Sequence, residues 1–69
     1  MDHVYRVTEI VGSSTNSLDE AIRNALDRAT RTLRHVDWFV VSEIRGTVQD
    51  NQVGSYQVGL KVGFRLEEE

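Results

Sequence analysis

Few side chains in this 69-residue sequence have the types and spacing needed for chemistry. There is no cysteine, and the single tryptophan, Trp38, lies in the run Asp37-Trp38-Phe39. An indole has the largest flat surface of any side chain and stacks on planar ligands. A tryptophan at the start of a strand is ordinarily a packing residue, so both interpretations stay open on this residue alone. A flat aromatic ligand against Trp38 is the first binding hypothesis.

The remaining candidate residues do not form a catalytic or metal-binding pattern. His3 and His35 are far apart, and neither has a second histidine or a cysteine at ligand spacing, so we expect no metal site. Ser13 and Ser14 follow Gly12 without a paired base, and this run lacks the glycine spacing and the lysine of a phosphate loop. We therefore predict that the protein is not an enzyme and has no catalytic residues.

Size and charge narrow the classes of function further. The chain fits one domain, residues 1–69, and a core this small is marginal without disulfides, so we expect self-association. A net charge of −3 argues against nucleic-acid binding. No apolar run approaches the ~20 residues that cross a bilayer, and Met1-Asp2-His3-Val4 lacks the features of a signal peptide. We expect a cytoplasmic protein that contacts neither membrane nor nucleic acid.

The elements that must position Trp38 begin with a strand and a helix. Residues 3–11 are rich in β-branched and aromatic types, and residues 12–16 are turn formers. Apolar residues at helical spacing predict an amphipathic helix over 17–35. Ser17 and Glu20 form a predicted capping box at its start, and Arg31 and Arg34 are expected in its last turn, where they complement the helix dipole.

Residues 38–49 and 52–66 predict a β-hairpin. Asp50-Asn51 connects them, and both residue types tolerate the positive φ of a type I′ turn. The last strand alternates cleanly between apolar and other residues, whereas the middle strand changes phase, so we expect a bulge near Arg45-Gly46.

The resulting fold class is α+β, in the order β-α-β-β. It consists of a three-stranded antiparallel sheet, with the last strand central, packed on one amphipathic helix. One helix covers only one face of such a sheet. The opposite face carries Gln57, Lys61 and Arg65 and needs either water or another subunit.

Taken together, five short motifs resemble the dodecins, small flavin-binding proteins that assemble as hollow dodecamers. The resemblance covers nearly the whole chain. The motifs, which are specific only in combination and in this order, are Val11-Gly12-Ser13-Ser14, Asp37-Trp38-Phe39, Arg45-Gly46, Tyr56-Gln57-Val58 and Lys61-Val62-Gly63-Phe64-Arg65-Leu66-Glu67.

This resemblance implies a flavin site between subunits at a two-fold axis. Trp38, beside Asp37, would stack on the flavin ring, and Gln57 would hydrogen-bond the ring's polar edge. Arg45 would meet the ribityl and phosphate end, which favours FMN over riboflavin, and both riboflavin and FAD stay open as alternative ligands. The implied function is non-enzymatic storage and sequestration of FMN, with bound flavin quenched by the stacked tryptophan.

Two alternatives to flavin storage stay open. In the first, the protein is mainly a cage-forming assembly module, and coenzyme A or another ligand binds as the main or an additional role. The resemblance suggests Arg6, Arg28 and Arg65 as the coenzyme A-binding residues. In the second, the protein is a flavoenzyme subunit, which predicts that bound flavin turns over with a reductant and an acceptor.

The chain departs from the family pattern at two positions. Many relatives have an acidic residue where this chain has Val40 and a polar one where it has Ile44. Simple alternation along the strand places both on the same face as Trp38, so we expect a more apolar pocket wall.

Overall fold

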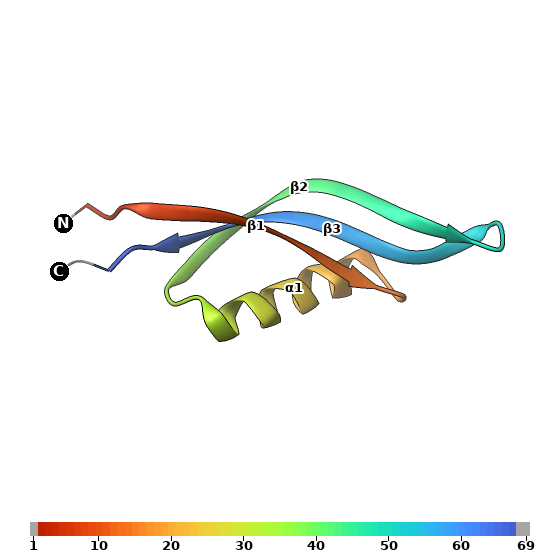
Figure 1. The fold of residues 1–69 in the computed structure, drawn as a ribbon, viewed down its shortest axis with the longest axis horizontal. Helices are drawn as coiled ribbons and strands as arrows, with labels where there is room; N and C mark the ends of the chain where they lie inside the picture. Colours follow the sequence, from red (N-terminus) through yellow and green to blue (C-terminus); the bar gives the residue numbers. More distant parts are fainter. Residues whose placement is uncertain (1, 68–69) are drawn as a thin grey trace.

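The computed structural model describes residues 2–67 as three strands and one helix. Their bounds are β1 Tyr5–Ser14, α1 Leu18–Thr32, β2 Val36–Gln49 and β3 Gln52–Arg65. The sheet order is β1-β3-β2 with antiparallel pairing throughout, so β3 is central. Figure 1 shows α1 as a second layer on one side of the sheet, with the β2–β3 hairpin projecting beyond it. The predicted α+β class and β-α-β-β order are confirmed.

Helix α1 begins where the sequence predicted but ends earlier. The Ser17 side chain caps the helix by accepting a hydrogen bond from the Glu20 backbone N–H at 3.0 Å. The other bond of the predicted capping box, from the Ser17 backbone N–H to the Glu20 carboxylate, is wrong. That carboxylate instead accepts from the Ser14 hydroxyl at 2.7 Å and from the Asn16 amide. Because the helix ends at Thr32, the placement of Arg34 in its last turn is also wrong.

Strand β1 begins and ends later than the sequence predicted, at Tyr5 and Ser14 instead of at residues 3 and 11. Gly12, Ser13 and Ser14 belong to the strand rather than to a loop, because each pairs with the long central strand β3. Gly12 also has a packing role: a Cβ there would meet the Ala21 carbonyl oxygen and lie 2.7 Å from the Ala25 Cβ. The missing side chain at Gly12 therefore lets α1 lie directly against β1.

The core lies between α1 and one face of the sheet. It consists of Val58, Leu60 and Val62 from β3, which are fully buried, together with Ala21 and Ala25 from α1. Small residues on the helix and β-branched or leucine residues on the strand allow close packing of the two layers. The predicted alternation of β3 side chains is confirmed. Between the buried residues, Gly59 and Lys61 lie on the opposite face of the sheet, and Lys61 is exposed there.

The hairpin has the predicted turn, an irregularity next to the predicted bulge position, and a further bulge that the sequence did not predict. Asp50 and Asn51 have φ values of 53° and 62°, as a type I′ turn requires. The register of β2 against β3 shifts at Ser42, between Val41 and Glu43, and again between Thr47 and Val48, directly after the predicted position at Arg45-Gly46. The shift at Ser42 arises from the pairing of β2 with β3, and no glycine marks it in the sequence.

The bulge at Ser42 determines which β2 residues lie on the same face of the sheet. Trp38 pairs with Gly63 and Val40 with Lys61, so both lie on the face opposite α1, which we call the open face. Beyond the bulge, Ile44 pairs with the buried Val58 and faces the helix side. The expectation that Ile44 shares Trp38's face is therefore wrong.

Within residues 2–67, no helix combines the length and the apolar character required to cross a membrane.

Candidate ligand-binding face

Trp38 lies on the open face with its indole against the central strand. Gly63 pairs with Trp38, and a Cβ built on Gly63 would come within contact distance of three indole carbons, with Cδ2 at 2.6 Å. One surface of the ring therefore rests on the sheet at a position that has no side chain. The Trp38 residue is 39% exposed. An indole held in this way presents its other surface as a flat apolar platform.

Tyr5 forms one border of this platform. Its ring centroid is 6.1 Å from that of Trp38, with the two planes tilted by 53°. That separation lies in the range of favourable aromatic pairs. Val7 and Val40, both about half exposed, lie beside Gly63 and Trp38 on the same face. An aromatic and apolar area thus occupies one end of the open face.

A polar group occupies the same face further along the hairpin. Arg45 and Gln57 are direct partners across β2 and β3, and the Arg45 Nε–H donates to Gln57 Oε1 at 2.8 Å. A second Arg45 nitrogen, Nη1, lies 3.1 Å from the Glu43 carboxylate. Besides these two nitrogens, Arg45 has further N–H groups that can donate to a ligand. The amide nitrogen of Gln57 is also a donor. This group offers a positive charge and hydrogen bonds, which suit a polar or anionic ligand end.

These two parts of the open face are far apart within one chain. Their anchor residues on β3, Gly63 and Gln57, are six residues apart in the register. At about 3.3 Å per residue, this separation is roughly 20 Å. Gln57 therefore cannot hydrogen-bond the edge of a ring stacked on Trp38 of the same chain. A ligand that uses both residues must lie between two copies of the chain.

Asp37 lies next to the platform, in the short irregularity at the start of β2. The register passes from the Val36–Phe64 pair to the Trp38–Gly63 pair, so Asp37 occupies the shift between them and is exposed. The structure therefore places three of the predicted flavin residues, Trp38, Arg45 and Gln57, on one face of the sheet. It places Asp37 at the border of the aromatic end.

The predicted coenzyme A residues do not meet at one place within the chain. Arg28 lies on a groove of about 540 Å³ between α1 and β1. Arg6 pairs with Phe64 on the helix side of the sheet, whereas Arg65 pairs with Tyr5 on the open face and contacts the His35 ring at 3.3 Å. Any site that uses all three arginines needs more than one copy of the chain.

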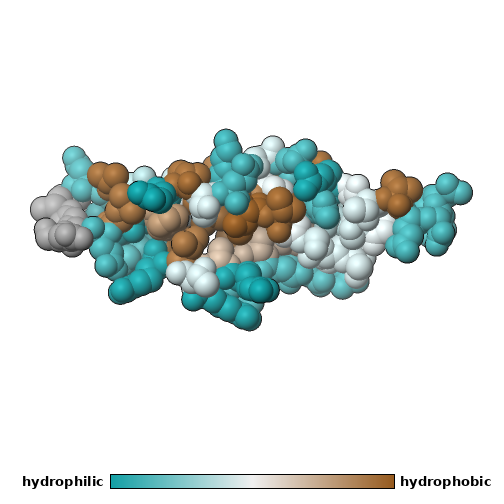
Figure 2. All heavy atoms as spheres, viewed as in Figure 1, coloured by the Kyte–Doolittle hydropathy of each residue, from teal (hydrophilic) through white to brown (hydrophobic). Residues whose placement is uncertain are grey.

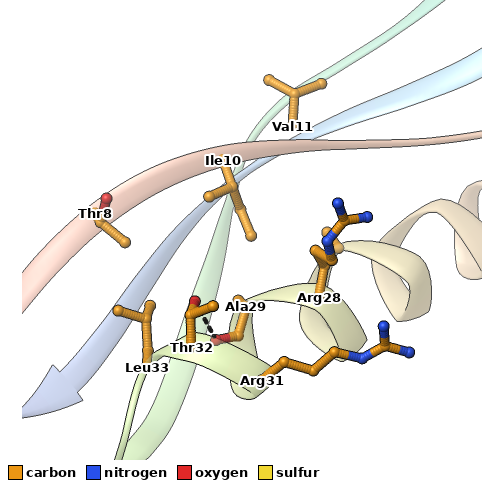
Figure 3. Close-up of a pocket in the computed structure, with 9 residues that line it drawn as sticks. Thr8, Ile10, Val11, Arg28, Ala29, Arg31, Thr32 and Leu33 are labelled. Atoms are coloured by element: carbon orange, nitrogen blue, oxygen red, sulfur yellow. Dashed lines mark hydrogen bonds between the residues drawn. The ribbon is translucent and has the colours of Figure 1, made fainter.

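The groove itself is apolar with a basic rim. Figure 3 shows Ile10 and Ala29 on its walls, from β1 and α1, with the Arg28 side chain projecting away from the helix and the Arg31 side chain extending along it. Arg31 is paired with Asp27 at 2.8 Å. Figure 2 shows apolar side chains reaching the surface between β1 and α1, bordered by hydrophilic ones. This surface is a second place where the chain is incompletely covered.

Sequence reasoning missed two members of the aromatic platform, Tyr5 and Gly63. Both appear in the sequence as ordinary strand residues. The available signal was the alternation of β3, which puts Gly63 on the face away from the core. The pairing of Gly63 with Trp38 required the register of the hairpin, which the bulge at Ser42 alters further along the strand.

Comparisons with known proteins agree with this architecture. The sequence profile of the Dodecin family matches residues 4–67. A curated dodecin of Thermus thermophilus is 57% identical over 68 residues, which are 99% of each chain. The structure of dodecin from Streptomyces davaonensis matches with a TM-score of 0.94 and 53% identity, over 99% of this chain and 100% of that one.

Structures of substituted T. thermophilus dodecin also match. The W38F variant has a TM-score of 0.91 and 55% identity, over 97% of this chain and 100% of that one. Structures of R45A and R65A variants of the same protein match similarly.

Proposed function

The chain belongs to the dodecin family, and from this membership and the open face of the sheet we propose that it binds flavin, preferentially FMN, between copies of itself. The function is storage and sequestration of the flavin without chemical turnover. The observation that carries the proposal is the Trp38 indole, which lies flat on Gly63 with its other surface free on a face that the helix does not cover.

A symmetric interface explains how one tryptophan per chain can enclose a flat ligand. In a two-fold contact, the same surface of both copies takes part, so two Trp38 platforms face each other. Each indole has one surface on the sheet and one free surface, so each stacks on one flavin ring. The predicted stoichiometry is therefore one flavin per chain. Stacked indoles can donate an electron to the excited flavin, which accounts for quenching of its fluorescence.

The polar group at the other end of the open face completes the site from the partner copy. Gln57 supplies an amide that both donates and accepts, which suits the polar edge of a flavin ring. Arg45 supplies a fixed positive charge and a planar fork for a phosphate, and this favours FMN over riboflavin. Arg45 and Gln57 are hydrogen-bonded to each other, so each side chain restrains the other on the open face.

The substituted Thermus dodecins support the choice of residues. Their substitutions, W38F, R45A and R65A, carry the same residue types and numbers as Trp38, Arg45 and Arg65 of this chain. Two of these three residues lie in the proposed flavin site. The third, Arg65, pairs with Tyr5 beside the aromatic platform.

Replacement of Trp38 by alanine tests the proposal. Trp38→Ala should abolish FMN binding while leaving the oligomer, measured by light scattering, unchanged. The matched control is Val48→Ala, because Val48 is also an exposed apolar residue of β2, at 78%, but pairs with Val53 at the far end of the hairpin. Retention of wild-type FMN affinity by Trp38→Ala would refute the stacked site.

A second candidate function is assembly itself, with flavin binding secondary and coenzyme A as another ligand. The observation that favours it is the apolar strip on the helix side of β2, where Phe39, Val41 and Ile44 are all at least 40% exposed. Such a strip is covered in a self-associated protein, and the family resemblance implies a dodecamer. Collapse of the oligomer in Trp38→Ala, together with loss of FMN, would favour assembly as the role of Trp38.

A further inference from the structure

Gly63 occupies an unusual position on the central strand. It lies between Val7 on β1 and Trp38 on β2, on the open face, and it is buried. What buries it is the indole of Trp38, which fills the space a side chain would take. The contact involves three carbons, Cδ2, Cε2 and Cζ2, which belong to the six-membered ring of the indole. The flat contact is therefore made by the ring itself and not by its edge.

The two aromatic residues of the platform come from strands that are not neighbours. Tyr5 is on β1 and Trp38 on β2, with β3 between them. Their rings nevertheless approach to 6.1 Å between centroids. A side chain at position 63 would stand between them, since side chains project roughly perpendicular to a sheet. The absence of a side chain at Gly63 allows both the flat indole and the cross-sheet aromatic pair.

We propose that Gly63 is a positioning residue, which sets the height of the Trp38 indole above the sheet and so makes the site fit a flat polycyclic ring. The inference rests on the proposed function, because the ring is that of the flavin. Gly63 does not touch the ligand in this account. It acts through Trp38.

A methyl group at residue 63 would change the distance between the indole and the sheet. Indole Cδ2 is 2.6 Å from the position of a Cβ on residue 63, whereas ordinary van der Waals contact begins near 3.4 Å. An alanine therefore forces the indole to rise from the sheet or to tilt. In a two-fold site both indoles rise toward each other, so the space for the ligand narrows from both sides. A tilt instead removes the parallel arrangement that stacking needs.

Gly59 provides a matched control four residues earlier on the same strand. It is also buried on the open face, and it pairs with Val11 and Glu43. Its added Cβ would lie 3.0 Å from the Ser42 hydroxyl and 3.5 Å from the Glu43 Cβ, and no aromatic ring lies among these neighbours. Gly59→Ala therefore makes the same chemical change in the same strand without moving Trp38.

The first experiment uses ligand-free protein and a double-mutant cycle of Gly63→Ala, Trp38→Ala and the combination. Gly63→Ala should lower the unfolding temperature and change the emission maximum of Trp38. In the Trp38→Ala background the same substitution should leave the unfolding temperature nearly unchanged, because the obstructing ring is gone. An equal decrease in both backgrounds would overturn the inference, since the cost would then lie in the backbone.

The second experiment measures the affinity of the folded variants for FMN and riboflavin by fluorescence quenching. Gly63→Ala should weaken both ligands by about tenfold or more, because both share the ring that loses its stacking. Gly59→Ala should bind both as the wild type does. Wild-type affinity in Gly63→Ala, or an equal loss in Gly59→Ala, would overturn the inference.

Failure to fold also gives a decisive result. If Gly63→Ala does not fold, Gly63→Ala with Trp38→Ala should fold, and failure of both would overturn the inference. The proposed function has a separate outcome: a wild-type protein that binds no flavin would refute it. The ligand-free cycle would still report whether residue 63 sets the position of the indole.

Discussion

Arg45 and Gln57 face each other across β2 and β3, with the Arg45 Nε–H donating to Gln57 Oε1 at 2.8 Å. Both lie on the face of the sheet that carries Trp38, about 20 Å from it along β3. Aromatic stacking and polar recognition are therefore divided between the two ends of one chain. Only an assembly of copies can join these ends around one ligand.

Replacement of Arg45 by alanine should separate recognition of phosphate from recognition of the ring. We expect Arg45→Ala to weaken FMN binding by about tenfold to a hundredfold, since a charge-assisted hydrogen bond to phosphate is worth about 1.5–3 kcal/mol, and to affect riboflavin much less. Parallel titrations with the two flavins measure this difference.

Two control variants are compared with Arg45→Ala. Arg23→Ala removes an exposed helix arginine that pairs only with Asp19 among the described contacts, and it should leave both affinities unchanged. Gln57→Ala removes the partner of the ring edge, and it should weaken FMN and riboflavin alike. An equal loss of both flavins in Arg45→Ala would show that Arg45 acts by holding Gln57 and not through the phosphate.

Packing of α1 on β1 should be sensitive to Gly12. Gly12→Ala places a methyl group against the Ala21 carbonyl and the Ala25 side chain, so the helix must move. We expect a loss of about 2 kcal/mol in the free energy of unfolding, as is typical of overpacked cores. Chemical denaturation measures the loss. In the control Gly59→Ala, the nearest atom is the Ser42 hydroxyl oxygen at 3.0 Å, which can rotate away, and the Glu43 Cβ at 3.5 Å is in ordinary van der Waals contact. Equal effects at the two positions would contradict the packing role of Gly12.

The start of α1 should make stability depend on pH. Hydrogen bonds from Ser14 and from Asn16 hold the pKa of the Glu20 carboxyl below its ordinary value of 4.5. A lowered native pKa stabilises the fold above 4.5, and this contribution is lost as the pH falls from 4.5 through the native pKa. Glu20→Gln should therefore unfold at a lower temperature than the wild type at pH 7, and the difference should shrink at pH 3.

A charge-matched control isolates this effect. Asp2→Asn also removes one exposed carboxylate, but at a position outside the helix and the sheet. It should unfold at the wild-type temperature at pH 7. A difference between Glu20→Gln and the wild type that stays constant from pH 7 to pH 3 would assign the effect to the amide itself and not to ionisation.

Local signals predicted most of the fold. Ser17 fixes the helix start, Asp50-Asn51 defines the hairpin turn, and the alternation of β3 identifies its buried face; all three agree with the structure. The run Gly12-Ser13-Ser14 was misassigned because its composition favours a loop, whereas pairing with β3 extends the strand. Tertiary pairing decided that segment, and a single sequence does not display it.

The candidate site was predictable in its residues but not in its arrangement. Trp38, Arg45 and Gln57 came from motifs, yet placing them on one face required the bulge at Ser42. The same bulge moves Ile44 to the helix side and leaves Val40 beside Trp38. The roles of Tyr5 and Gly63 depend on which residues are opposite each other across three strands, and only the register supplies that information.

The most direct test of the central claim is a titration of ligand-free protein with FMN, in which flavin and Trp38 emission are followed together. Our account predicts strong quenching of FMN that saturates near one flavin per chain, with parallel loss of Trp38 emission. Unchanged FMN emission throughout the titration would contradict the flavin site.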